Sequence, residues 1–199
     1  MAEGIRCTTR KKIWNDSPVE DFNIFYAAEQ LQGKHAYQTG NFLTYRGDKK
    51  MLAILPLSED ELAIQCYIHN TANVDKLQDI SKGLLSETFK DLDEKALKLL
   101  KELEAKGGIF SDKIGMVNEP FLYKGRVVLL GDAGYCPTAL SGMGASLSIY
   151  GAKALVHYID KSPTDLNEAF ANYNTLMQPI IQKFQINARK NARTFLPMS

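Results

Sequence analysis

Apolar and polar residues alternate most clearly between about His35 and Asn70. Three apolar runs, NFLTY, KKMLAILPL and ELAIQCYIH, are separated by the short polar segments Arg46-Gly47-Asp48 and Ser58-Glu59-Asp60. In the third run a period of two puts four apolar residues on one face: Leu62, Ile64, Cys66 and Ile68. The pattern predicts three strands in an antiparallel meander, and it makes the Arg-Gly-Asp tripeptide a hairpin turn rather than an adhesion signal.

The period becomes helical from about Asn73 to Lys106. One face carries Leu92, Ala96, Leu99, Leu100 and Leu103. Asp91 followed by Glu94 resembles a capping box at the start of a helix, and Gly107-Gly108 predicts its end.

The last third of the chain opens with a continuous apolar run, Arg126–Leu130. A strand buried on both faces, as in a parallel sheet, is typically written this way. A loop containing Gly, Pro and Ser follows, and small residues then predict a helix from about Gly142 to Ile159. Ser162-Pro163 predicts the start of another helix with Ser as N-cap, which Pro179 should kink or split in two.

Composition and charge mainly exclude classes of protein and kinds of site. The 199 residues contain 24 Lys and Arg against 23 Asp and Glu, and a net charge of +1 gives no basic face for nucleic acid or an anionic membrane. No apolar run reaches the ~18 residues of a spanning helix, and the start lacks the apolar stretch of a signal peptide. Cys7, Cys66 and Cys136 are scattered and odd in number, which favours a reducing cytoplasm over a disulfide framework. Neither the cysteines nor the three histidines have metal-site spacing, so no metal is expected.

The segment Gly125–Leu155, GRVVLLGDAGYCPTALSGMGASLSIYGAKAL, carries the chemistry. It combines a strand ending in Gly131-Asp132, a spaced loop, and the pair Gly142 and Gly144 at the start of a helix. A carboxylate at the carboxyl end of a strand can accept hydrogen bonds from sugar-type hydroxyls, and glycines at a helix start let a flat or phosphorylated ligand approach free N–H groups. Two such glycines alone also occur where a helix merely packs closely on a strand.

This order of elements resembles the second flavin-binding motif of the FAD-dependent aromatic monooxygenases, the para-hydroxybenzoate hydroxylase-like family. The residues that match are Gly131, Asp132, Ala133, Gly142, Gly144 and Ala152. Tyr135 stands where His is common in the family. Three positions depart from its pattern: Ala139 replaces a common Pro, Ser146 a common Asn and Gly151 a common Asp.

A second resemblance lies at the start of the chain. Glu3-Gly4-Ile5-Arg6-Cys7-Thr8-Thr9-Arg10 is similar to the family's Asp-Gly motif, in which Ser and Arg follow at this spacing. Gly4 and Arg10 match, whereas Glu3 replaces Asp and Cys7 replaces Ser. Taken alone, the segment is an ordinary basic, solvated terminus.

The family's opening strand–GxGxxG–helix does not occur in this sequence, and even a minimal βαβ unit needs about 30 residues. The resemblance therefore implies the C-terminal half of a monooxygenase with a mixed α/β (α+β) fold and without the first βαβ unit. The expected parts are a remnant of the Asp-Gly motif (1–20), an antiparallel-sheet substrate domain (21–118), the Gly-Asp segment of a Rossmann-like FAD domain (119–160) and C-terminal helices (161–199).

The resemblance implies FAD as cofactor and NAD(P)H as co-substrate, with one oxygen atom of O2 transferred to an aromatic or similar small molecule. Asp132 would hold the ribityl chain, and the sheet face from Phe42 to Ile68 would wall the substrate pocket. The remaining residues expected at the cofactor are Arg10, Gly131, Gly142, Met143, Gly144 and Ala145, with the backbone N–H groups of the glycine-rich part stabilising negative charge on the reduced ring. No catalytic side chain is assigned.

Three readings of the function remain open at this point. The first is a flavin-dependent monooxygenase whose C-terminal half is inactive on its own. The second is a non-enzymatic remnant that binds a ligand or a partner, such as a missing N-terminal half or a second copy of the chain. The third is an unrelated α+β domain with a chance G-x-G.

Overall fold

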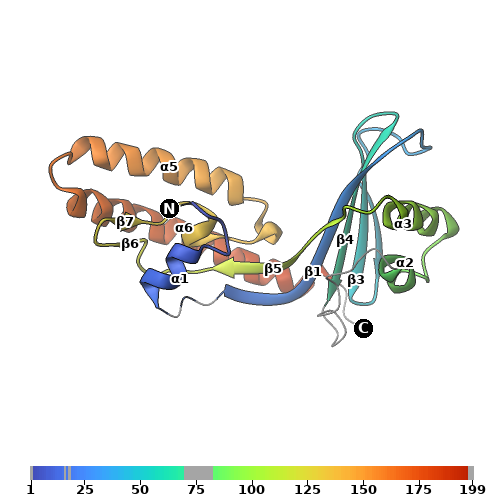
Figure 1. The fold of residues 1–199 in the computed structure, drawn as a ribbon, viewed down its shortest axis with the longest axis horizontal. Coiled ribbons are helices and arrows are strands. Elements are labelled where there is room, and N and C mark those ends of the chain that lie inside the picture. Colours follow the sequence, from blue (N-terminus) through green and yellow to red (C-terminus); the bar gives the residue numbers. More distant parts are fainter. Residues whose placement is uncertain (1, 16, 18, 70–82, 197–199) are drawn as a thin grey trace. The chain divides into compact units, whose positions relative to one another are not determined.

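The fold was analysed in a computed structural model, which describes residues 2–15, 17, 19–69 and 83–196. The chain divides into two compact units (Figure 1). Of the described residues, the first comprises those up to Phe22 and Ile114–Phe195, and the second comprises those from Asn23 to Lys113 and Leu196.

A five-stranded sheet forms most of the second unit. Its strands are β1 (Val19–Gln32), β2 (Leu43–Gly47), β3 (Lys50–Pro56), β4 (Glu61–His69) and β5 (Phe110–Val117), in the order β2-β3-β4-β1-β5. The antiparallel pairs β2–β3 and β3–β4 confirm the predicted meander. The first turn lies slightly later than predicted, because the Arg46↔Met51 and Gly47↔Lys50 pairs leave only Asp48 and Lys49 outside the ladder.

Helices cover one face of this sheet. α2 (Leu84–Thr88) and α3 (Glu94–Lys106) bury Leu85, Phe89, Leu100 and Leu103 against the predicted β4 face of Leu62, Ile64, Cys66 and Ile68 (Figure 1). The capping residue of α3 is Asp93, whose carboxylate accepts from the Ala96 N–H at 2.8 Å. The prediction of Asp91 was wrong, because Asp91 lies outside the helix and pairs with Lys50. Gly107 ends α3 as predicted, and the predicted helical segment at 73–82 lies outside the described residues.

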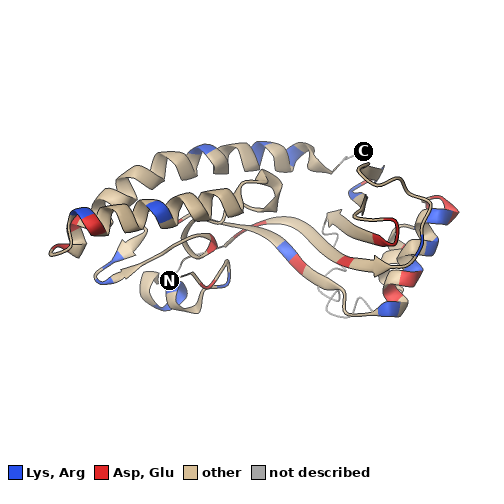
Figure 2. Cartoon of the chain, turned by 90° about the horizontal axis from the view of Figure 1, so that it is seen from above, with Lys and Arg blue, Asp and Glu red and all other residues tan. Residues whose placement is uncertain are grey.

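The first unit is built on two long helices that lie side by side, α5 (Gly144–Lys161) and α6 (Leu166–Phe195), as Figures 1 and 2 both show. The N-cap predicted at Ser162 was wrong: the Ser162 N–H still donates to Tyr158 in the last turn of α5. Asp165 caps α6 instead, accepting from two N–H groups at 3.0 Å. Pro179 does not split α6, since Met177 and Ile181 on either side of it are completely buried and hold the helix in place.

The predicted strand Arg126–Leu130 is much shorter in the structure. Only Val127–Val128 (β7) is a strand, and it pairs antiparallel with Tyr123–Lys124 (β6) instead of entering a parallel sheet. The run 126–130 is apolar because its end is buried and not because the strand is longer. Leu129 is 0% exposed and packs with Cys7 and Ala133.

Among the described residues, no helix is both long and apolar enough to cross a membrane. The three cysteines are buried and free.

Candidate functional site

The Gly-Asp segment turns sharply into the short helix α4 (Asp132–Tyr135), and Gly131 makes this turn possible. Its φ of 63° is a conformation that side chains disfavour, and a Cβ added there would lie 2.9 Å from the Ser148 Oγ of α5. The predicted Gly131 is therefore required both by its backbone conformation and by the close approach of α5.

Not all of the predicted N–H donors at the glycine-rich loop are available. The loop contains the 3-10 turn η3 (Ala139–Ser141), and the Gly142 N–H donates to the Ala139 carbonyl. The Met143 N–H donates to the Ser141 hydroxyl at 3.1 Å. Gly142 itself has φ 64° and open space where a Cβ would point, so it contributes a bend and room rather than a donor.

The free donors lie one position further on, at the start of α5. The first N–H groups of a helix have no carbonyl partner inside it, and α5 has no side-chain cap. These groups belong to Gly144, Ala145 and Ser146, of which the last two are exposed. The exposed Asp132 carboxylate lies beside them, 3.8 Å from a Cβ built on Gly144.

Charge is distributed unevenly along α5 and around its start. The N-terminus of an 18-residue helix carries a partial positive charge, and the charged residues of α5 (Lys153, Asp160 and Lys161) all lie in its C-terminal half (Figure 2). Asp132 adds a strong acceptor next to these donors. The Asp132 carboxylate suits a ligand that offers hydroxyl groups, and the free N–H groups of α5 suit acceptor atoms on an electron-rich edge of the same ligand.

Arg10, predicted as a cofactor-binding residue, is 0% exposed. Its guanidinium donates to the carbonyls of Ala133 and Ile5, both at 2.7 Å, and to the Ser17 hydroxyl at 2.8 Å. Glu119 lies 3.6 Å away and is itself buried. The side chain thus joins the two motifs found in the sequence, but it has no free surface on which a ligand could lie in this conformation.

Glu3 helps to cap helix α1 (Thr8–Trp14), whose N-cap residue is Cys7. Its carboxylate accepts from the N–H and hydroxyl groups of Thr8 and Thr9 over 2.8 to 3.3 Å. Hydrogen bonds from Thr9, Cys7 and Thr8 lower the pKa of Glu3 from its usual 4.5 to about 2. The replacement of Asp by the longer Glu therefore leaves a working cap.

Tyr135 stands where the family commonly has His, and Gly151 where it commonly has Asp. One contact explains why the two occur together. A Cβ at Gly151 would lie 2.1 Å from the Tyr135 hydroxyl, so α5 has room for this Tyr only because residue 151 has no side chain. The buried Tyr173 hydroxyl lies 3.2 Å from both the Tyr135 hydroxyl and the Leu129 carbonyl. Burial raises the pKa of Tyr135 and of Tyr173, so both remain phenols.

Several supporting residues could not be found from the sequence. Tyr173 and Gln185 lie on α6, and the Gln185 side chain donates to the buried Val117 carbonyl at 2.7 Å. Thr138 has φ 66°, an uncommon conformation for a β-branched residue, and its hydroxyl accepts from the Leu140 N–H. In the sequence Gly151 was noted only as a departure from the family pattern, and the structure shows that its missing side chain makes room for Tyr135.

The second unit offers an aromatic surface on the sheet face opposite α2 and α3. Tyr26 and Tyr67 are paired across β1 and β4 with ring centroids 5.0 Å apart, and Phe110 lies 6.2 Å from Tyr26. Burial raises the pKa of Tyr67 to about 12 and also raises that of Tyr26. The β4 residues predicted to share one face point into the helix-covered core, so among the described residues it is the opposite face that could wall a ligand.

Comparisons with known proteins place this geometry in context. No protein-family model matches the chain. A flavin-dependent monooxygenase from an unidentified prokaryote is 36% identical over 193 residues, which cover 92% of this chain and 49% of the relative. A flavin-dependent monooxygenase from Legionella longbeachae is 29% identical over 152 residues, covering 72% of this chain and 39% of the relative. The chain spans about half the length of the curated relatives it matches first.

Solved structures agree in fold. Tetracycline destructase Tet(55) has a TM-score of 0.84 and 25% identity, over 98% of this chain and 52% of that one. HpxO of Klebsiella pneumoniae, crystallised with FAD and uric acid, has a TM-score of 0.80 over 96% of this chain and 49% of its own. Its 21% identity shows similarity of fold alone.

Proposed function

Because the chain belongs to the flavin-dependent monooxygenase family and spans about half the length of its relatives, we propose that it supplies the C-terminal half of an FAD-dependent monooxygenase. The observation that carries the proposal is the exposed Asp132 carboxylate beside the uncapped N-terminus of α5. This donor and acceptor set fits FAD, which combines a polyhydroxylated chain with an electron-rich ring.

Bound FAD would supply the redox chemistry, taking electrons from NAD(P)H and activating O2, while the chain orients it and keeps water away. Asp132 would accept hydrogen bonds from ribityl hydroxyls. The N–H groups of Gly144 and Ala145 would stabilise negative charge on the ring. Gly131, Gly142 and Met143 would shape the loop, and Arg10 would hold the Asp132 segment in position through the Ala133 carbonyl.

The substrate we propose is an aromatic or similar electron-rich small molecule. The support for this class is the open sheet face with Tyr26, Tyr67 and Phe110, since the rings of a substrate stack favourably on aromatic side chains. An aromatic surface of this kind contacts a ring by stacking and binds no particular functional group, so it accommodates substrates with different substituents.

A specific observation also supports the partner-binding role as a second candidate. Unit 1 exposes large apolar side chains: Phe121 at 64%, Ile149 at 72%, Val156 at 58% and Ile186 at 63%. Ile149 and Val156 are seven residues apart on α5 and share one face. We propose that the α5 face with Ile149 and Val156 meets an N-terminal half that carries the pyrophosphate site or, alternatively, a second copy of the chain.

The flavin site is tested by titrating FAD into the 199-residue chain while backbone amide resonances are recorded. We expect the amides of Gly144 and Ala145 to shift, with a dissociation constant weaker than about 1 µM because one half of the site is tested alone. Asp132→Asn should weaken binding about tenfold or more, since a charged acceptor is lost. Asp160→Asn, an exposed acid at the other end of α5, is the matched control.

Equal affinity of both variants would remove Asp132 from the site, and binding tighter than about 1 µM would contradict the idea of half a site. The monooxygenase proposal is tested separately. If the gene upstream of Met1 encodes an in-frame GxGxxG, the complete protein should purify yellow and oxidise NADPH. A full-length product without flavin would refute it.

A further inference from the structure

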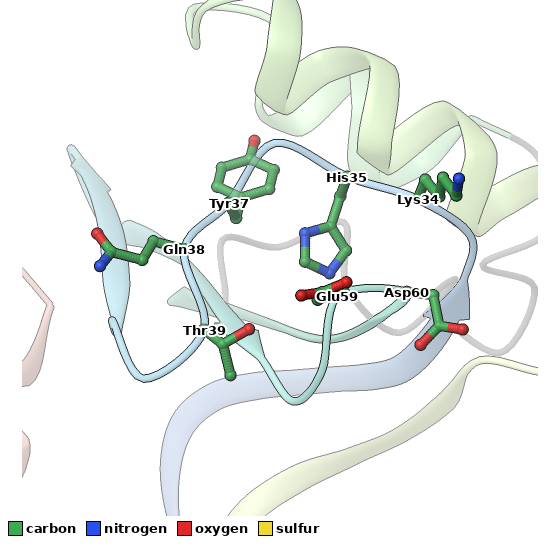
Figure 3. Close-up of a pocket in the computed structure, with 7 residues that line it drawn as sticks. All are labelled: Lys34, His35, Tyr37, Gln38, Thr39, Glu59 and Asp60. Atoms are coloured by element: carbon green, nitrogen blue, oxygen red, sulfur yellow. The ribbon is translucent and has the colours of Figure 1, made fainter.

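A pocket in the second unit shares no residue with the Gly-Asp segment. It has a volume of about 680 Å³, within the range typical of small-molecule sites. Two segments line it: Lys34, His35, Tyr37, Gln38 and Thr39 from the loop after β1, and Glu59 and Asp60 from the turn between β3 and β4 (Figure 3).

The two walls are fixed to one another by hydrogen bonds that do not involve the pocket interior. The Gly33 N–H donates to the Asp60 carbonyl at 2.7 Å. The Gln32 amide donates to Glu61 at 2.9 Å. Within the second wall, the Ser58 hydroxyl donates to the Asp60 carboxylate at 2.7 Å and holds the turn. The pocket is therefore a formed feature of this end of the sheet.

Polar atoms in the pocket wall lack partners. Both ring nitrogens of His35 are buried without a hydrogen bond. Folded proteins pair nearly all such groups, so two orphaned nitrogens on one side chain need an explanation. Burial, with further contributions from Tyr45 and Asp93, raises the pKa of Tyr37 to about 12, and its protonated hydroxyl interacts with Tyr45 and points away from the other lining side chains (Figure 3).

The lining chemistry narrows the class of ligand. No aliphatic residue is among the described residues that line the pocket, which disfavours an apolar molecule. Two carboxylates against one lysine disfavour an anion. An imidazole, a phenol, an amide, a hydroxyl and two carboxylates together offer donors and acceptors on several sides. Hydroxyl groups, which both donate and accept, complement such a set.

We propose that this pocket binds a neutral, polyhydroxylated small molecule of about monosaccharide to disaccharide size, with His35 as its central contact. The ligand pairs the His35 nitrogens, while Glu59 and Gln38 take further hydroxyls. The site is independent of the proposed flavin site and would stand if that proposal failed.

The test uses the full 199-residue chain and amide spectra recorded during titration with methyl α-D-glucopyranoside and maltose, up to about 100 mM. We expect saturable shifts confined to residues 34–39 and 59–60. His35→Phe should weaken binding about tenfold or more, whereas His157→Phe, an exposed histidine on α5, should leave it unchanged. The spectra themselves report whether each variant is folded.

Glu59 provides a second variant, because it is exposed and its replacement leaves the core intact. Glu59→Gln should weaken binding by a smaller factor than His35→Phe. The proposal is overturned if neither sugar causes saturable shifts, if His35→Phe binds as well as the parent chain, or if phosphate, phenol or tetramethylammonium occupies the pocket in preference to the sugars.

Discussion

The two units bury different kinds of residue. In unit 2 the described core is hydrophobic, built from strand and helix faces, and Glu104 is its one buried charged residue. In unit 1 the described residues include four buried polar or charged side chains: Arg10, Glu119, Thr138 and Gln185. Three of these side chains pair backbone groups around the Gly-Asp segment: Arg10 the Ala133 carbonyl, Thr138 the Leu140 N–H and Gln185 the Val117 carbonyl at the end of β5. Glu119 pairs instead with the side chains of Arg10 and Ser17.

The difference has a physical basis. A sheet face and a helix stripe satisfy their own backbone groups, so apolar packing is enough to hold them. A loop that must present a carboxylate and free N–H groups cannot pair its backbone internally, and buried side chains pair it instead. Glu104 follows the same rule in unit 2, since it accepts from the N–H groups of Leu85 and Ser86 where α2 begins.

Removing Arg10 should have the largest effect. Arg10→Ala leaves Glu119 buried without its cation and three acceptors without a donor, so we expect the free energy of unfolding to fall by about 3–5 kcal/mol. Urea denaturation measures this. The matched control is Arg189→Ala, which breaks an exposed pair with Glu20 at 2.7 Å and should cost about 0–1 kcal/mol. Similar losses for both arginines would show that polar side chains do not hold unit 1.

Filling the space at Gly151 should have an intermediate effect. Gly151→Ala forces a Cβ onto the Tyr135 hydroxyl, and we expect a loss of about 1–3 kcal/mol although Ala favours helices. In a Tyr135→Phe background the penalty should shrink, because the clashing oxygen is gone. Gly144→Ala, whose nearest contact is 3.8 Å away, should stay within about 0.5 kcal/mol of the parent. Strictly additive costs for 135 and 151 would disprove the contact.

Acid should have the smallest effect, confined to α1. The folded pKa of Glu3, about 2, lies below its usual 4.5, so its capping contribution is present above pH 4.5 and is lost as the pH falls toward 2. The amide shifts of Thr8 and Thr9 should titrate with a midpoint near 2. Glu3→Gln should abolish that transition, and a midpoint near 4.5 in the parent would contradict the cap.

Sequence patterns predicted what periodic burial determines. The meander and the core face of β4 follow from apolar spacing. The end of α3 follows from Gly107-Gly108, and the two long helices follow from a run of small residues and from Ser162-Pro163. β1 and β5 were missed, and the strand at Arg126–Leu130 was overextended, because pairing partners are not visible in a single run. The residues of the flavin site and the boundaries at 20, 118 and 160 remain predictions. Gly144 and Ala145 were expected among the donors, but the loss of the Gly142 and Met143 donors could not be predicted, since it depends on Ala139 and Ser141 accepting from their N–H groups.

The contact between Tyr135 and Gly151 has a consequence for exchanging segments between relatives. A Gly-Asp segment carrying Tyr at 135 can be transplanted only together with a helix that carries Gly at 151. Conversely, an acidic side chain introduced at 151 requires a smaller or differently directed residue at 135. The two positions, sixteen residues apart, must therefore be exchanged together. A chimera that separates them would place a side chain at 151 against the Tyr135 hydroxyl, next to the Gly-Asp segment.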